Sequence, residues 1–259
     1  MASARQNIRM FSRHTTALDR RMLRLERKYR ALFYKELQRQ KDELIRTGSF
    51  TSKFEDIYLQ LYKEDGYQII VNQYKLLKGL QTTKDNFFST TWRVWLDAFI
   101  STRMGQKIVS IDNTTRKAVQ DLISRNVGNS FENIADQMTM FDRKRAMRIA
   151  RTEVAQMANE SQKRGMLSWK DELTDVMQEG LPVAYKMWMH RGAKDPRDGH
   201  LNLHGTTIRE DELFQIVSEN GVEQADYPHA SGLSASNVVN CGCTVVYVSE
   251  NYYRQRLKN

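Results

Sequence analysis

The segment Asn240-Cys-Gly-Cys-Thr-Val-Val-Tyr-Val248 decides the fold class of this chain of 259 residues. From Cys243 onward it is rich in β-branched and aromatic side chains, which is typical of a β-strand. A second segment of strand composition is Ala184-Tyr-Lys-Met-Trp-Met189. The residues between these two segments include many that favour loops and turns: Gly192, Pro196, Gly199, Gly205, Gly221, Pro228 and Gly232. We therefore expect a small antiparallel sheet with long connections.

The chain before this region predicts helices. All three prolines follow residue 180 (Pro182, Pro196 and Pro228), and apolar residues before them recur at helical spacing. We expect helices over about 15–46, 54–80 with a weak point at Gly66, 84–104, 113–124, and from Asp142 onward, where Asp142 is the N-cap. Two shorter helices are expected, one capped by Ser130 and one that begins near Glu210 and contains Phe214. The aromatic residues of 84–104 are expected in the core: Phe87, Phe88, Trp92, Trp95 and Phe99.

The fold class predicted from these elements is α+β. A mainly α-helical region over residues 1–125 precedes a compact α+β domain over residues 126–259. A hydrophobic content of 40% with 27% charged residues fits a globular chain. No run approaches the roughly 18 apolar residues of a membrane span, and the basic N-terminus does not resemble a signal peptide. We expect folding in a cytosol, where Cys241 and Cys243 stay reduced, because a disulfide between them would be strained.

The positive charge is concentrated at one end. Residues 1–50 hold 13 Lys and Arg against 5 Asp and Glu, a net charge of +8, whereas residues 151–259 hold 12 against 15, a net charge of −3. In the segment 20–28 the basic residues alternate with an apolar stripe, as on a helix with one packed face: Arg20, Arg21, Arg24, Arg27 and Lys28. Such a face is suited to the phosphates of nucleic acid, without base readout. It could equally dock on an acidic protein surface or be a solvated helix face.

Polar residues of the C-terminal domain follow one another in a definite order. Ile149-Ala-Arg151-Thr-Glu153 and Asn159 lie on a helix, and Trp188 ends a strand. The segment from Asp195 to Gly205 follows and holds Arg197 and His200. Phe214 and Asn240-Cys241-Gly-Cys243 complete the order.

This order resembles the Mu F-like minor head proteins of tailed phages, over about residues 125–248. Their signature is a helix reading A-R-T-E with a later Asn, then W, D-x-R-x-x-H-x-x-L-D-G, F and N-C-R-C before a strand. Two positions depart from it: His204 stands for the Asp of L-D-G, and Gly242 stands for the Arg of N-C-R-C.

The resemblance implies a non-enzymatic virion component, assembled in the host cytoplasm into the phage head near the portal vertex. The partners it implies are the portal protein, genomic double-stranded DNA bound without sequence preference, and a major capsid or scaffold protein; no membrane or cofactor is expected. It assigns a set of residues to a polar core that holds the helix, the central loop and the last strand together: Arg151, Glu153, Asp195, Arg197, His200, Asn240, Cys241 and Cys243. Asn159, Trp188 and Gly205 belong to the same motif. Within this core, His200 is expected to pair with Glu153 or Asp195.

A metal site is the first alternative for these residues. His200, His204, Cys241 and Cys243 have spacings that suit a Cys₂His₂ zinc site. The interpretation that we favour from the sequence is that both cysteines are small buried hydrophobic residues. Arg197 supports it, because an arginine stands where some relatives have a cysteine, and a cation there argues against a bound metal ion.

An enzyme is the second alternative. His200 with Asp195, Asp198 and Glu153 could form a nuclease-like site, and Cys241 could be a nucleophile beside a histidine. However, the sequence contains no G-x-S-x-G, no H-E-x-x-H and no phosphate-binding glycine-rich loop.

Overall fold

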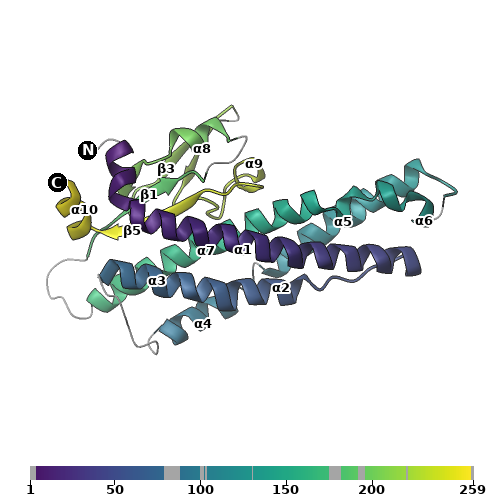
Figure 1. Ribbon diagram of the computed structural model, residues 1–259, viewed down its shortest axis with the longest axis horizontal. Helices are drawn as coiled ribbons and strands as arrows, with labels where there is room; N and C mark the ends of the chain where they lie inside the picture. The colour runs from purple at the N-terminus through teal and green to yellow at the C-terminus, as the bar shows by residue number, and fades with distance from the viewer. Residues whose placement is uncertain are drawn as a thin grey trace.

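The computed structural model describes residues 4–78, 88–99, 102, 104–129, 131–174, 182–191, 196–219 and 221–257. Long helices run side by side along the molecule, and the strands gather at one end, near both chain termini (Figure 1). The helices are α1 (Ala4–Thr47), α2 (Phe54–Gln60), α3 (Tyr67–Lys78), α4 (Phe88–Phe99), α5 (Gly105–Arg125), α6 (Phe131–Ile134), α7 (Arg143–Thr174), α8 (Asp198–Asn202), α9 (Ala235–Val238) and α10 (Glu250–Leu257). The strands are β1 (Ala184–Met189), β2 (Thr207–Arg209), β3 (Phe214–Ser218), β4 (Gly221–Ala225) and β5 (Thr244–Ser249).

Within the described residues the two expected strands are present, and so are the expected helices except for the one near Glu210. The predicted weak point at Gly66 is the end of a π-helical turn, Leu61–Gly66, which joins α2 to α3. Asp142 caps α7 as predicted, because its Oδ1 accepts a hydrogen bond of 2.7 Å from the backbone N of Arg145. Trp95 and Phe99 stack at 5.2 Å in the core. The side chains of Phe88 and Trp92, together with Phe87 and Ser130, lie outside the described residues.

One local prediction was wrong, the helix that was expected to begin near Glu210 and to contain Phe214. Phe214 opens strand β3 and is not in a helix, because burial alternates along the strand and Gly221, at φ 110°, reverses the chain into β4. The acidic residues near 210 form a turn after β2. The Glu210 carboxylate accepts a hydrogen bond from the backbone N of Ala184, and that of Glu212 accepts one from the backbone N of Arg209. The segment after β5 is the helix α10.

Two antiparallel sheets are present in the described chain. One has the strand order β2-β1-β5 and the other pairs β3 with β4. In the first sheet Met187 pairs with Val246 and Trp188 with Val245. The fold class is therefore α+β, as predicted. Among the described helices, none combines the length and the apolar character needed to cross a bilayer.

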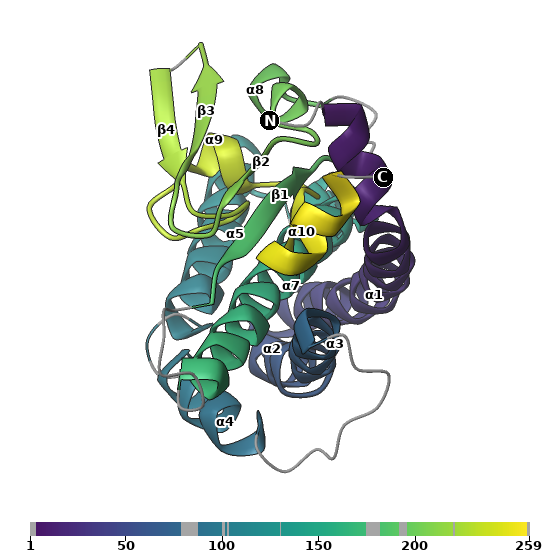
Figure 2. The ribbon, with the colours of Figure 1, turned by 90° about the vertical axis from the view of Figure 1, so that its left-hand side faces the viewer.

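Helix α7 lies at the centre of the arrangement. It contacts α1, α3 and β5 (Figure 2). The helices α1 and α7 are antiparallel, because Glu26 lies near Arg151 whereas Gln38 contacts Phe141. The main hydrophobic cluster holds residues from Leu18 to Tyr253 and continues across the boundary predicted at 125/126. The division into two domains stays a prediction, and the described residues on its two sides share one core.

Gly165 permits the close approach of α3 to α7. A Cβ atom at this position would lie 2.8 Å from the carbonyl oxygen of Ile70 and 2.8 Å from the Cβ of Gln73. Backbone and Cβ atoms cannot turn away, so the two helices would have to separate.

We predict that Gly165→Ala lowers the free energy of unfolding by about 1–3 kcal/mol, the usual effect of overpacking. Urea denaturation followed by circular dichroism measures it. Gly105→Ala is the matched control, because its Cβ would meet no atom within 4 Å. Equal stability of the Gly165→Ala protein and the wild type would contradict the close packing of α3 on α7.

Candidate functional site

A buried seam of polar contacts joins α7 to β5, and Asn159 forms its centre. The side chain of Asn159 is fully buried. Its Nδ2 donates to the carbonyl oxygen of Cys243 at 3.0 Å, and its Oδ1 accepts from the backbone N of Val245 at 2.7 Å. Asn159 thus supplies partners to backbone groups that have lost water.

The loop before β5 makes further contacts with α7 and with the segment before α8. The backbone N of Asn240 donates to Thr152 Oγ1 at 2.8 Å, and Arg151 Nη1 donates to Asn240 Oδ1 at 3.4 Å. Asn240 has a positive φ of 59°, a conformation that asparagine tolerates better than most residues. Arg197 Nη2 donates to the carbonyl oxygen of Val239 at 2.7 Å.

The structure therefore brings most of the predicted polar-core residues to the loop before β5. Glu153 and Asp195 are not among them. Glu153 is buried on α7, but its carboxylate pairs with Lys107 Nζ of α5 at 2.6 Å and does not contact His200. The expected pairing of His200 with Glu153 is therefore wrong. Asp195 lies outside the described residues.

The glycine and tryptophan of the motif have backbone and packing roles. Gly205, at φ 79°, donates its N–H to the carbonyl oxygen of Trp188 at 2.9 Å. The indole of Trp188 is fully buried and packs edge-on against Phe214, with ring centroids 5.3 Å apart.

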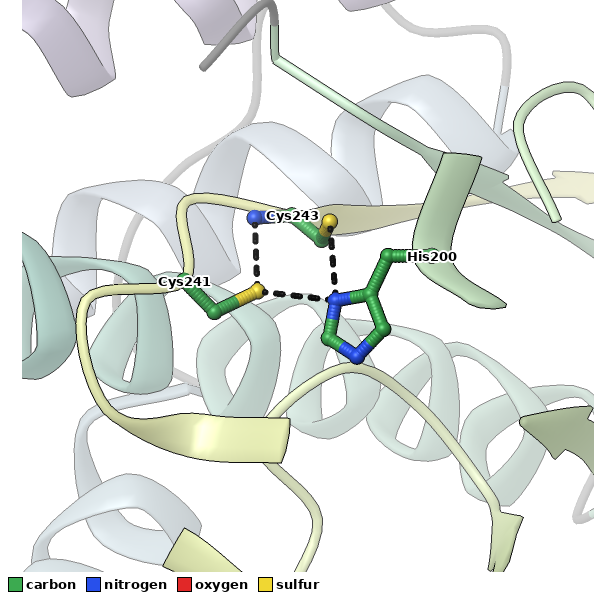
Figure 3. A group of neighbouring side chains, drawn as sticks. All are labelled: His200, Cys241 and Cys243. Carbon is green, nitrogen blue, oxygen red and sulfur yellow. Dashed lines mark hydrogen bonds between the residues drawn. The ribbon is translucent and has the colours of Figure 1, made fainter. Parts of the chain in front are cut away.

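His200, Cys241 and Cys243 form a buried cluster (Figure 3). The Nδ1 of His200 lies 3.3 Å from Cys241 Sγ and 3.6 Å from Cys243 Sγ. Each of the three residues is at most 4% exposed. Among the described residues, this is the set of His, Cys, Asp and Glu side chains that could hold a metal ion.

His204 does not join this cluster. Its Nδ1 accepts a hydrogen bond of 3.1 Å from the backbone N of His190. The Cys₂His₂ set that was weighed as an alternative is therefore not brought together as a whole, because His204 lies outside the cluster.

The two thiols have opposite pKa shifts. Hydrogen bonding from Cys243, aided by His200 and His229, lowers the pKa of Cys241. The same contact with Cys241, together with burial, raises the pKa of Cys243. A buried sulfur offers no access to a macromolecular substrate, so the geometry gives no support to a nucleophilic Cys241.

A buried lysine is a feature that the sequence analysis missed. Lys186 of β1 is fully buried and its Nζ pairs with Asp226, which also pairs with Lys163 of α7. Burial lowers the pKa of Lys186. Burial would raise the pKa of Asp226, but hydrogen bonds from Lys163 and Lys186 outweigh it and lower this pKa. A single lysine in a strand gives no sequence signal for such a partner 40 residues away.

The basic residues of α1 divide into exposed and engaged ones. Arg20, Arg24 and Arg27 are exposed. Arg21 is half-buried, and burial lowers its pKa. Lys28 pairs with Asp65 at 2.9 Å and lies over the ring of Tyr29.

A hollow of about 420 Å³ lies between α1 and α7. Its lining combines three cations with apolar and aromatic groups: Arg30, Ala31, Tyr34, Arg143, Lys144 and Met147. The sequence analysis had not connected the cations of the two helices, since they are more than 100 residues apart.

Comparison with known proteins identifies the class. The family model described as Phage Mu protein F like protein matches residues 111–246, just over half of the chain. The chain belongs to this family, which is one of structural phage head proteins.

One curated relative is uncharacterized protein YqbB of Bacillus subtilis (strain 168). It is 31% identical over 138 residues, which cover 51% of this chain and 41% of that protein. The chain thus spans well under half the length of this curated relative. No solved structure matches.

We predict that Asn159→Ala lowers the free energy of unfolding by about 3 kcal/mol, because it leaves a buried N–H and a buried carbonyl group without partners. Thermal denaturation gives the measurement. The exposed Asn113→Ala on α5 is the control, expected within about 0.5 kcal/mol of wild type. A loss no greater than that of the control would show that Asn159 does not anchor β5.

A second prediction concerns the buried ion pair. Asp226→Asn leaves the Lys186 cation buried without a counter-charge, and we expect a loss of about 3 kcal/mol in unfolding free energy. Adding Lys186→Met to this variant should recover most of the loss, because no buried charge then remains. Urea denaturation of the two variants is the measurement; failure of Lys186→Met to recover any stability would count against a charge effect.

Proposed function

We propose that this chain is a minor head component that acts beside the portal and contacts genomic DNA through the basic side of α1 and the beginning of α7. The family supports the first part, since its members are phage head proteins. The distribution of exposed charge supports the second part. Portal protein is the partner for assembly, and the portal vertex is the proposed location in the virion.

The row of arginines on α1 is the observation that carries the DNA contact. Arg20, Arg24 and Arg27 are spaced four and three residues apart, so they lie on one side of the helix. They extend over about 10 Å of the helix axis. Within the described chain these three side chains take part in no ion pair. Their charges are therefore not neutralised by an ion pair within the described residues.

The hollow between α1 and α7 extends this basic surface. Ala31, one turn beyond Arg27, lines it together with Arg143 and Lys144. The guanidinium group of Arg143 lies over the ring of Tyr34, 5.1 Å from its centroid. Cations supplied by two helices that are packed together form a rigid surface for a phosphate backbone, which carries no sequence information.

The opposite side of α1 is committed to the core. Met22, Tyr29 and Phe33 are fully buried. Removal of residues 1–50 would expose the core that α1 shares with α7, so a truncated chain cannot test the DNA contact. Substitution of exposed side chains can.

The test is the binding of a fluorescent double-stranded DNA over a range of salt concentrations. We predict salt-sensitive, sequence-indifferent binding by the full chain. The triple variant Arg20→Gln, Arg24→Gln, Arg27→Gln should reduce the slope of log K against log salt by about 3, because each phosphate contact contributes about 0.9.

The control carries the same change in charge elsewhere. Lys117→Gln, Arg209→Gln and Arg254→Gln replace three exposed cations and should leave the slope unchanged. Equal slopes for the two triple variants would remove α1 from the DNA contact. The absence of binding by the wild-type chain would overturn the DNA contact altogether and leave a head protein that contacts only other proteins.

A further inference from the structure

We propose that His200, Cys241 and Cys243 bind a divalent metal ion of the zinc class. The three ligand atoms come from two segments, α8 and the loop before β5, and converge in one buried place (Figure 3). This site is independent of the DNA contact, and it modifies the sequence-based preference for two ordinary buried cysteines.

The distances fit a tetrahedral ion. Zinc lies about 2.3 Å from thiolate sulfur and about 2.0–2.1 Å from imidazole nitrogen, so the nitrogen and sulfur ligands of one ion lie about 3.6 Å apart. The Nδ1 of His200 lies 3.3 Å from Cys241 Sγ and 3.6 Å from Cys243 Sγ. The ion would need only small movements of side chains.

The hydrogen bond of His200 to Asn237 uses Nε2 and leaves Nδ1, the nitrogen that faces the sulfurs, free to bind a metal ion. Asn237 Nδ2 donates to the carboxylate of Glu223 at 2.8 Å, which fixes the orientation of the amide. Asn237 Oδ1 therefore faces His200 Nε2, at 3.1 Å, as an acceptor. The proton of the neutral ring must then be on Nε2, and the lone pair of Nδ1 points at the sulfurs. A ligating histidine commonly has such an outer partner.

Two neutral buried thiols without a metal ion explain the contacts around His200 less well. One Nδ1 lone pair can accept a hydrogen bond from one thiol, and here two thiols face it. Two further buried side chains hydrogen-bond to the sulfurs, Trp188 to Cys243 and His229 to Cys241. The backbone N of Cys243 donates to Cys241 Sγ at 3.3 Å. Metal-bound thiolates would accept such donors more strongly than neutral thiols do.

Charge and donor type select the ion. Two thiolates neutralise a divalent cation, so the buried site would carry no net charge. Sulfur and imidazole donors favour zinc over magnesium or calcium. Arg197, whose position argued against a metal, is engaged by its guanidinium group with the carbonyl oxygen of Val239 and is not one of the convergent ligands.

His229 lies beside this cluster but is not one of the convergent ligands. It is 2% exposed, its Nε2 lies 3.1 Å from the carbonyl oxygen of Cys241, and its backbone has a positive φ of 66°. The ion would tie α8 to the loop before β5, and its binding free energy would add to the stability of the fold.

The first test uses the full chain, purified under reducing conditions without chelator. We expect about one zinc ion per chain by elemental analysis. Cobalt(II) added after zinc removal should give the visible bands of a tetrahedral centre and thiolate-to-cobalt charge transfer. Chelator should lower the melting temperature and added zinc should restore it. A wild-type chain without zinc and without a cobalt spectrum would overturn the proposal.

Variants assign the ligands. Cys241→Ser, Cys243→Ser and His200→Asn should each lose the charge-transfer intensity or the tight binding, whereas His204→Asn, outside the cluster, should keep both. Asn237→Ala should weaken zinc binding by about 10- to 100-fold, because it removes the outer partner of His200. A cobalt spectrum that is unchanged in both cysteine variants would place the metal elsewhere and contradict this site.

Discussion

The burial of β5 on both faces is the constraint on which the rest of the structure depends. Five of its six residues are buried, so its apolar side chains pack in two directions and its backbone has no water to bind. The pairing with β1 satisfies part of this requirement. Asn159 of α7 satisfies another part at the beginning of the strand, and Gln73 of α3 donates to the carbonyl oxygen of Tyr247 at 3.0 Å. Side-chain amides from two helices thus hold the sheet on the helical layer.

The central position of α7 follows from this constraint. A helix that contacts a sheet and two other helices needs small residues where its neighbours come close. Ala146, Ala150, Ala155 and Ala158 are buried along α7, and Gly165 admits the backbone of α3. The residues of the family motif on this helix therefore occupy positions where helix and strand are in contact, and the polar ones supply hydrogen bonds at that contact.

The charged side chains of this molecule form two groups, those paired at contacts between elements and those exposed on α1. Charges at the junctions are paired and partly buried, as Arg191 of the segment after β1 is with Glu26 at 2.7 Å and Asp19 at 3.2 Å. They hold α1 against the sheet end of the molecule. The exposed arginines of α1 take part in no ion pair of the described chain, and in the function that we propose they are the groups that meet a polyanion. The cysteine–histidine cluster adjoins the seam, since Cys243 belongs to the cluster and its carbonyl oxygen accepts from Asn159.

The sequence by itself determined the features that depend on neighbours along the chain. The strands at 184–189 and near 243–248, the cap at Asp142 and the common face of Arg20, Arg24 and Arg27 are all local patterns of period or spacing. Tertiary structure alone decided which distant groups meet. It chose His200 and excluded His204 from the cysteines, paired Glu153 with Lys107 and Lys186 with Asp226, and made Phe214 part of a hairpin. These outcomes depend on how the elements pack, because a side chain's partner is set by the position of a backbone that may be a hundred residues away.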